Sequence, residues 1–263
     1  MGLALAVLAS VGLSGAALAG SAWDEVRASV FSGRTIEPAG AMVQLSAPTR
    51  PDDQSHVPVE VKVALPDGRS IRSLTLIVDE NPTPVAAVFD FGQERHSARI
   101  ATKLRLNAAT DVRAIVEASD GQLYMADRFV KFAGGQASCS APPQGDPALI
   151  AANMGKMTFQ AVRKATVATE ITPSARLKVS HPNHTGMVMD QITLLYTPLR
   201  IVSELEVREG EERVFTMKGS MTLSQDPELD FDYRVNGSEK MHVLVSDSDG
   251  ASWQQSFPIG QGS

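Results

Sequence analysis

Hydrophobic and polar residues alternate along much of the first half of the chain, a pattern that predicts β-strands with one buried face. The most regular example runs over residues 57–65, and a turn signal of proline and glycine follows at 66–68. Further short segments of this kind lie at 74–78, 85–91, 98–106, 112–116 and 123–132. Asp120 and Gly121 predict a hairpin between the last two. Together these segments predict an antiparallel β-sandwich.

The alternation returns in the second half of the chain. It covers residues 177–179, 199–208, 215–223, 229–235, 241–245 and 253–257. Asn236-Gly237 and Asp249-Gly250 are turn signals between the last three segments. We therefore expect a second, smaller sandwich, and a mainly β fold made of two immunoglobulin-like antiparallel β-sandwiches.

Short helices are predicted at two places outside the strands. Ser21 and Asp24 form a helix-starting pair, and Trp23, Val26 and Val30 follow at helical spacing. Residues 134–145 are rich in glycine, proline and small residues, which is typical of a flexible linker, and Asp146-Pro147 then predicts a short helix. The expected organisation is a signal peptide at 1–19, a first sandwich at 20–133, a partly helical linker at 134–165 and a second sandwich at 166–263.

The N-terminal segment predicts where the protein is located, and the net charge bears on its partners. Residues 3–19 are apolar and small and end in Ala17-Leu18-Ala19, which fits a cleaved export signal better than a membrane anchor, although only Met1-Gly2 precede them. We expect a periplasmic protein that is free of the membrane after cleavage. The net charge of −6, without a long basic run, argues against a nucleic-acid partner.

Cys139 is the only cysteine, so it cannot form an internal disulfide. Its small neighbours offer few packing partners, which favours an accessible thiol on a flexible arm that comprises Gly134, Gly135, Ala137, Ser138 and Ser140. A buried structural thiol is the alternative, because free cysteine is among the most buried residue types. No His or Lys lies beside Cys139 to activate it, and the common enzyme motifs are absent, which favours a carrier over an enzyme.

A second candidate segment contains two histidines and two methionines within nine residues. These are His181, His184, Met187 and Met189. Soft side chains of this kind can bind Cu(I). Pro182, Asn183 and Gly186 favour a loop between strands instead, so no metal or other cofactor is expected, and copper stays an alternative.

The two halves together resemble the sulfur-oxidation carrier proteins SoxY and SoxZ, in the fused form found beside quinoprotein dehydrogenases. Residues 23–26 (WDEV), 57–63 (VPVEVKV) and 128–135 (RFVKFAGG) resemble SoxY. Residues 181–202 (HPNHTGMVMDQITLLYTPLRIV), together with DPELDFDYRVNG and DSDGASW, resemble SoxZ.

The resemblance implies a non-catalytic carrier whose thiol is loaded with a small sulfur-containing group and presented to partner enzymes. The family arm ends in Gly-Gly-Cys-Gly-Gly; Cys139 matches its cysteine, and Gly134 and Gly135 match the leading glycines. This chain departs from the pattern, because residues 136–138 separate the glycines from the cysteine and 124 residues follow it. SoxY and SoxZ associate in the related complex, so the two sandwiches are expected to contact each other.

Three functions remain open from the sequence. The first is an exported carrier that uses Cys139 and serves periplasmic redox enzymes of a Sox or quinoprotein dehydrogenase system. The second is a non-catalytic adaptor for such a dehydrogenase, which handles copper through His181, His184, Met187 and Met189. The third is a free-standing enzyme.

Overall fold

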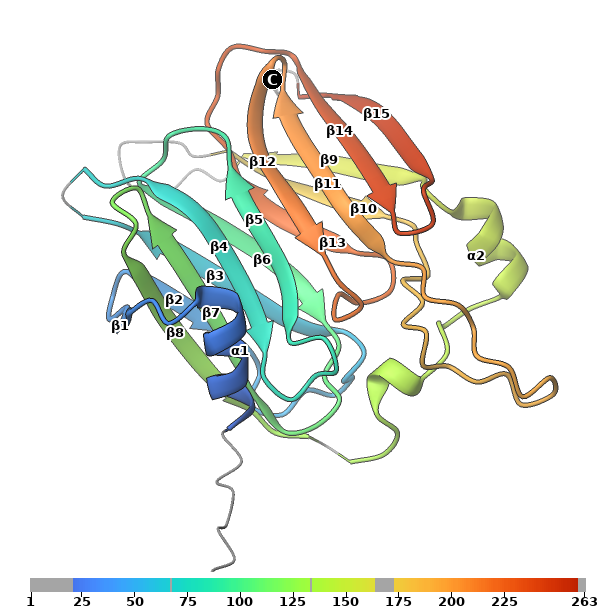
Figure 1. Ribbon diagram of the computed structural model, residues 1–263. Coiled ribbons are helices and arrows are strands. Elements are labelled where there is room, and N and C mark those ends of the chain that lie inside the picture. Colours follow the sequence, from blue (N-terminus) through green and yellow to red (C-terminus); the bar gives the residue numbers. More distant parts are fainter. Residues whose placement is uncertain (1–20, 67, 133, 164–172, 260–263) are drawn as a thin grey trace, which may run out of the picture. The chain divides into compact units, whose positions relative to one another are not determined.

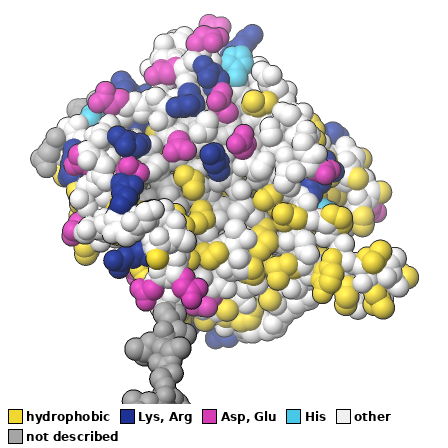
Figure 2. All heavy atoms as spheres, in the orientation of Figure 1, with side chains coloured by type: hydrophobic (Ala, Val, Ile, Leu, Met, Phe, Trp, Pro, Cys, Tyr) yellow, Lys and Arg dark blue, Asp and Glu magenta, His cyan; other side chains and the backbone are white. Residues whose placement is uncertain are grey.

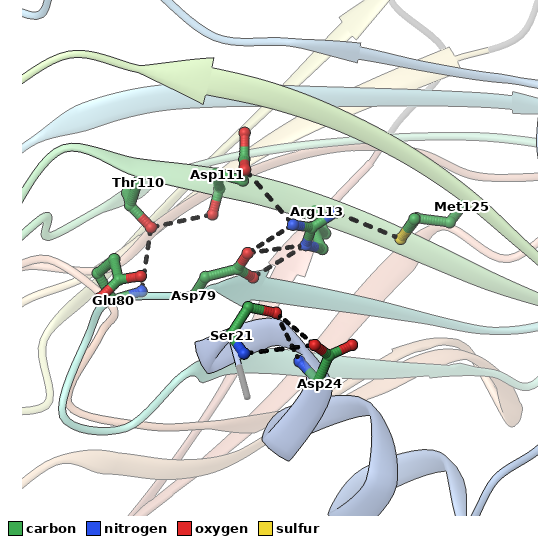
Figure 3. Close-up of polar contacts among 8 residues, drawn as sticks. All are labelled: Ser21, Asp24, Asp79, Glu80, Thr110, Asp111, Arg113 and Met125. Carbon is green, nitrogen blue, oxygen red and sulfur yellow. Dashed lines mark hydrogen bonds and ion pairs between the residues drawn. The ribbon is translucent and has the colours of Figure 1, made fainter. Parts of the chain in front are cut away.

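The computed structural model describes residues 21–66, 68–132, 134–163 and 173–259. The predicted signal peptide lies outside these residues. The predicted N-terminal helix is confirmed as α1 (Ala22–Phe31), which begins at Ser21. The Ser21 hydroxyl accepts a hydrogen bond from the Asp24 amide, and the Asp24 carboxylate accepts one from the Ser21 amide, a reciprocal pair that satisfies two free donors (Figure 3).

The first half of the chain is a sandwich whose strands pair antiparallel, as the alternation predicted, apart from one short parallel edge strand. Its strands are β1 (Ile36–Pro38), β2 (Val43–Ser46), β3 (Val57–Ala64), β4 (Ile71–Val78), β5 (Val85–Phe91), β6 (Ser97–Leu104), β7 (Thr110–Ala118) and β8 (Leu123–Val130). In β3 all four valines from Val57 to Val63 are buried, and the residues between them are exposed or half-buried. The sequence did not predict the short strands β1 and β2.

The second half is a smaller sandwich. Its strands are β9 (Met157–Arg163), β10 (Pro173–Val179), β11 (Val202–Glu209), β12 (Glu212–Gly219), β13 (Glu228–Asp232), β14 (Lys240–Asp247) and β15 (Ser252–Pro258). In the sequence, the 3-10 turn η1 (Ser138–Ser140) and the helix α2 (Pro147–Asn153) connect the first half to the second. The Asp146 side chain caps α2, as predicted. Strand β9 pairs along β10, so residues 157–163 belong to a sheet rather than to a linker.

The two sandwiches share their sheets, a relation that the sequence did not reveal. In the described residues the strands form a nine-stranded sheet, β1-β8-β7-β4-β5-β12-β11-β14-β15, and a six-stranded sheet, β2-β3-β6-β13-β10-β9. Strand β5 of the first half pairs with β12 of the second, and β6 pairs with β13 (Figure 1). The halves therefore join edge to edge through backbone hydrogen bonds.

Three phenylalanines fill the core where the halves meet. Phe89 lies on β5, Phe215 on β12 and Phe231 on β13, and all three are fully buried. The ring of Phe215 contacts that of Phe89 with centroids 5.7 Å apart and that of Phe231 with centroids 5.0 Å apart, both edge to face. One continuous hydrophobic core thus spans residues of both halves.

A buried ion pair fastens β4 to β7. Arg113 on β7 donates from Nε and Nη2 to the carboxylate of Asp79 at the end of β4, with distances of 2.6 to 3.0 Å (Figure 3). Asp111 adds a longer contact of 3.4 Å to the same guanidinium. The side chains of Arg113 and Asp79 are both nearly buried, so the stability of this ion pair depends on its bidentate geometry.

Candidate functional site

Cys139 lies in η1, within the segment that connects β8 to α2, and its side chain is 0% exposed. The prediction of a solvent-exposed thiol is wrong, and the alternative of a buried thiol is confirmed. The glycines before it, Gly134 and Gly135, are exposed and both have φ of +94°, a conformation that other residues rarely adopt. Ser138 is buried with Cys139, so the predicted arm is in part a fixed turn.

Partners from distant parts of the sequence hold this turn. The Ser138 hydroxyl donates to the carbonyl of Leu106 at 2.8 Å, and the Asn107 side chain accepts from the Cys139 amide at 2.9 Å. From the second half, the Thr185 hydroxyl donates to the Cys139 carbonyl. The small neighbours of Cys139 gave no sign of this, because its packing partners lie more than 30 residues away in the sequence.

Arg105 is the charged group that acts on the thiol. Burial raises the pKa of Cys139 above its ordinary value of 9.0, and the charge of Arg105 offsets part of this rise. Arg105 is 4% exposed, and burial lowers its pKa to about 10, so it remains charged at neutral pH. In the closed turn the thiol is therefore protonated and unreactive.

The contacts of Arg105 are backbone carbonyls of the second half. Its Nη1 donates to the carbonyls of Asn183 at 2.8 Å, Leu223 at 2.9 Å and Met221 at 3.1 Å. These oxygens accept hydrogen bonds but do not neutralise the charge of the guanidinium. A negative charge on Cys139 would raise the pKa of Arg105. Arg105 thus lowers the free-energy cost of an anionic sulfur at this site, although burial outweighs this effect for the thiolate of Cys139, whose pKa stays raised.

A pocket of about 920 Å³ lies beside the turn. Ser140, the residue after Cys139, lines it together with Met154 at the end of α2 and with His184, Met187 and Met189. The loop of residues 187–199, which includes Met187 and Met189, projects from the second half and carries hydrophobic side chains (Figures 1 and 2). Its exposed large hydrophobic residues are Met189, Ile192, Leu194, Leu195, Tyr196 and Leu199, with Ile192 92% exposed.

The two histidines that the sequence grouped together lie in different environments. His184 lines the pocket, and its Nδ1 is buried without a hydrogen-bond partner in the described structure. His181 is completely buried, with Nε2 3.6 Å from Asp247 Oδ2 and its ring 6.1 Å from that of Trp253. The proposed set of His181, His184, Met187 and Met189 is therefore wrong in His181, and the structure adds Met154 to the remaining three.

The described residues contain no group of three or more His, Cys, Asp or Glu side chains placed to hold a metal ion. No helix among them is long and apolar enough to cross a membrane.

Sequence reasoning missed Arg105, Asn107 and Thr185. Arg105 had a signal, because it is a charged residue between two leucines, Leu104 and Leu106, that are both fully buried. Thr185 lies between His184 and Met187, but no sequence pattern assigned it a role. Asn107 carried no local signal.

Comparison with known families fits the two-part fold. Residues 27–136 match the family described as "Sulfur oxidation protein SoxY", and residues 162–258 match "Sulphur oxidation protein SoxZ". The class is thus that of the β-sandwich carrier proteins of sulfur oxidation. Within it, the chain belongs to the SoxYZ family as a fused protein, SoxY-like in its first half and SoxZ-like in its second. Cys139 lies three positions after the end of the SoxY match.

Among solved structures, the sulfur carrier protein SoxY from Chlorobium limicola f thiosulfatophilum is 25% identical, with a TM-score of 0.37, over 43% of this chain and 96% of that one. A superoxide reductase (neelaredoxin) from Ignicoccus hospitalis is 18% identical, with a TM-score of 0.28, over 41% of this chain and 90% of that one. No curated protein gives a significant match.

Proposed function

We propose that the protein is an exported, non-catalytic carrier that holds a small sulfur-containing group on Cys139 and delivers it to periplasmic redox enzymes of a Sox or quinoprotein dehydrogenase system. The SoxY and SoxZ matches support the carrier class. The observation that carries the proposal is that the single cysteine is buried within the electrostatic influence of Arg105, a buried cation that donates to the uncharged carbonyls of Asn183, Met221 and Leu223. Such a cation favours the anionic forms that a sulfur carrier must hold.

The closed turn requires that loading and unloading follow an opening step. Opening breaks three hydrogen bonds, those of Ser138 with Leu106, of Cys139 with Asn107 and of Thr185 with Cys139. At about 1 kcal/mol net for each bond, the open state lies on the order of 3 kcal/mol above the closed one, before the change in side-chain burial is included. A partner that binds the open turn can supply this free energy.

Once open, Cys139 can accept a sulfane sulfur without any change in net oxidation. The thiol releases its proton to water, and the thiolate attacks the outer sulfur of a donor persulfide. A new S–S bond forms on Cys139, the S–S bond of the donor breaks, and the donor leaves as a thiolate with the electron pair. The product on Cys139 is a persulfide, which is anionic at neutral pH and suited to the neighbourhood of Arg105.

Intact mass spectrometry of protein purified from its native host tests this proposal. We expect an added mass on part of the protein, lost on treatment with a reductant and absent from Cys139→Ser. Wild-type protein without any reducible adduct, isolated while its host oxidises sulfur compounds, would contradict it. Cell fractionation with sequencing of the mature N-terminus tests export, for which we expect periplasmic protein that begins after Ala19.

A non-catalytic adaptor is the second candidate, favoured by the exposed hydrophobic loop at residues 187–199. Complementation of a deletion strain separates the two functions. A carrier requires the thiol, so Cys139→Ser should fail to restore oxidation of the substrate, whereas an adaptor that docks through the loop should work equally well with serine at this position. Full complementation by Cys139→Ser would therefore replace the carrier proposal with the adaptor.

A further inference from the structure

The pocket beside the turn brings together sulfur and nitrogen ligands from separate parts of the chain. Three of the ten methionines, Met154, Met187 and Met189, line it together with His184. Met154 follows helix α2, and the other three residues lie some 30 positions later in the loop after β10. Thioethers and one imidazole on the wall of a single pocket form a soft ligand set.

Backbone contacts hold the loop side of this set in place. His184 forms a bridge with Arg200, whose amide donates to the His184 carbonyl at 3.0 Å, and Met189 forms a bridge with Tyr196. The amide of Thr197 donates to the carbonyl of Val188 at 2.8 Å. Met187 and Met189 both line the pocket from this held segment.

The position of Met154 is fixed by the glycine after it. Gly155 has φ of +79°, and its amide donates to the Ser180 carbonyl at 2.8 Å. A Cβ at this position would lie 2.2 Å from the Trp253 ring, so the backbone can approach the ring only as glycine. This contact ties the end of α2 to the second sandwich and sets Met154 against the pocket.

His184 has an uncommitted ring nitrogen. Its Nδ1 is buried and has no hydrogen-bond partner in the described structure, a state that costs free energy unless another group uses the lone pair.

We propose that this pocket binds one Cu(I) ion through the thioethers of Met154, Met187 and Met189 and the imidazole of His184. Thioether sulfur selects Cu(I) over harder ions. The one carboxylate on the pocket wall, Asp190, already accepts hydrogen bonds from the amides of Ile192 at 2.9 Å and Thr193 at 2.7 Å. The pocket is larger than an ion, so the methionine side chains, which are long and unbranched, must converge on the metal.

Anaerobic titration of the full mature protein with Cu(I), in competition with a chromophoric Cu(I) chelator, tests the proposal. We expect one Cu(I) for each chain, and sulfur and nitrogen ligands in the X-ray absorption spectrum. Met154→Leu and Met187→Leu keep nearly the same side-chain volume. Each should weaken binding roughly tenfold or more, and the double variant should lose the site.

Two further variants make the result decisive. Met125→Leu, on β8 outside this pocket, should bind Cu(I) as the wild type does. Cys139→Ser should also retain the ion, so that failure of the copper site and failure of the carrier are distinguishable. Unchanged affinity in the Met154→Leu/Met187→Leu double variant would overturn the proposal, as would loss of binding in Cys139→Ser while the methionine variants keep it.

Discussion

Replacement of Thr185 by valine should release the turn that covers Cys139. In the closed state the Thr185 hydroxyl donates to the Cys139 carbonyl, and it accepts a hydrogen bond from the Met187 amide at 3.2 Å. Valine has a similar shape but no hydroxyl, so the buried carbonyl of Cys139 loses its partner. In the open state water satisfies the same carbonyl, so the loss acts on the closed state alone.

The size of the effect follows from the cost of an unsatisfied buried group. That cost is about 1 to 3 kcal/mol, which raises the open population roughly 5- to 150-fold. When the turn opens and closes faster than a reagent attacks, the rate of thiol modification is proportional to the open population. The rate of modification should therefore increase by the same factor.

Reaction with a chromogenic disulfide reagent under native conditions provides the assay. Wild-type protein should react far more slowly than the unfolded chain, because Cys139 is 0% exposed. Thr110→Val is a matched control, since the buried Thr110 hydroxyl also donates to a carbonyl, that of Asp111 at 3.1 Å, and accepts from an amide, that of Glu80 at 3.0 Å, but does not contact the turn. Equal acceleration in both variants would show that the thiol is exposed by global unfolding, which would refute a local opening.

Three further predictions concern stability and can be checked by urea unfolding. Asp79→Ala should lower the free energy of unfolding by about 3–5 kcal/mol, because it leaves the buried guanidinium of Arg113 without its main partner; a loss below about 1 kcal/mol would contradict the role given to this pair. Phe215→Ala should cost about 3–5 kcal/mol and leave a single transition, since both halves share this core; separate transitions for the halves would contradict a shared core. Burial lowers the pKa of His181 to about 4, so the unfolded chain takes up this proton at a higher pH than the folded one. Stability should therefore be full above pH 6.5 and fall by about 3 kcal/mol as the pH falls to 4, and His181→Leu should remove this slope.

Local patterns predicted the strands well wherever one face of a strand is buried and the other exposed. The alternation at residues 57–65 is such a case, and β3 covers almost the same residues. Strands β1 and β2 were missed because they are three and four residues long, too short for a period to show. Strand β9 was missed because residues 157–163 follow a glycine- and proline-rich stretch that favours a linker.

Contacts between distant residues decided the rest, and the sequence gave little sign of them. Asn107 and Thr185 bury Cys139, although its neighbours in sequence are small and flexible. The joining of β5 to β12 depends on the register of two edges, which no local pattern encodes. His181 and His184 are three positions apart, but only His184 reaches the pocket, because His181 packs against Asp247 and Trp253.

The continuity of the sheets has a consequence for how such a carrier can work. Separation of the halves would expose backbone hydrogen-bond donors and acceptors that are now paired inside the two sheets. They belong to the strands β5, β6, β12 and β13. Exposed edges of that kind recruit other chains and aggregate. Separation of the two halves is therefore unfavourable in this protein, and the proposed delivery of sulfur would require motion in the short connection that contains Cys139.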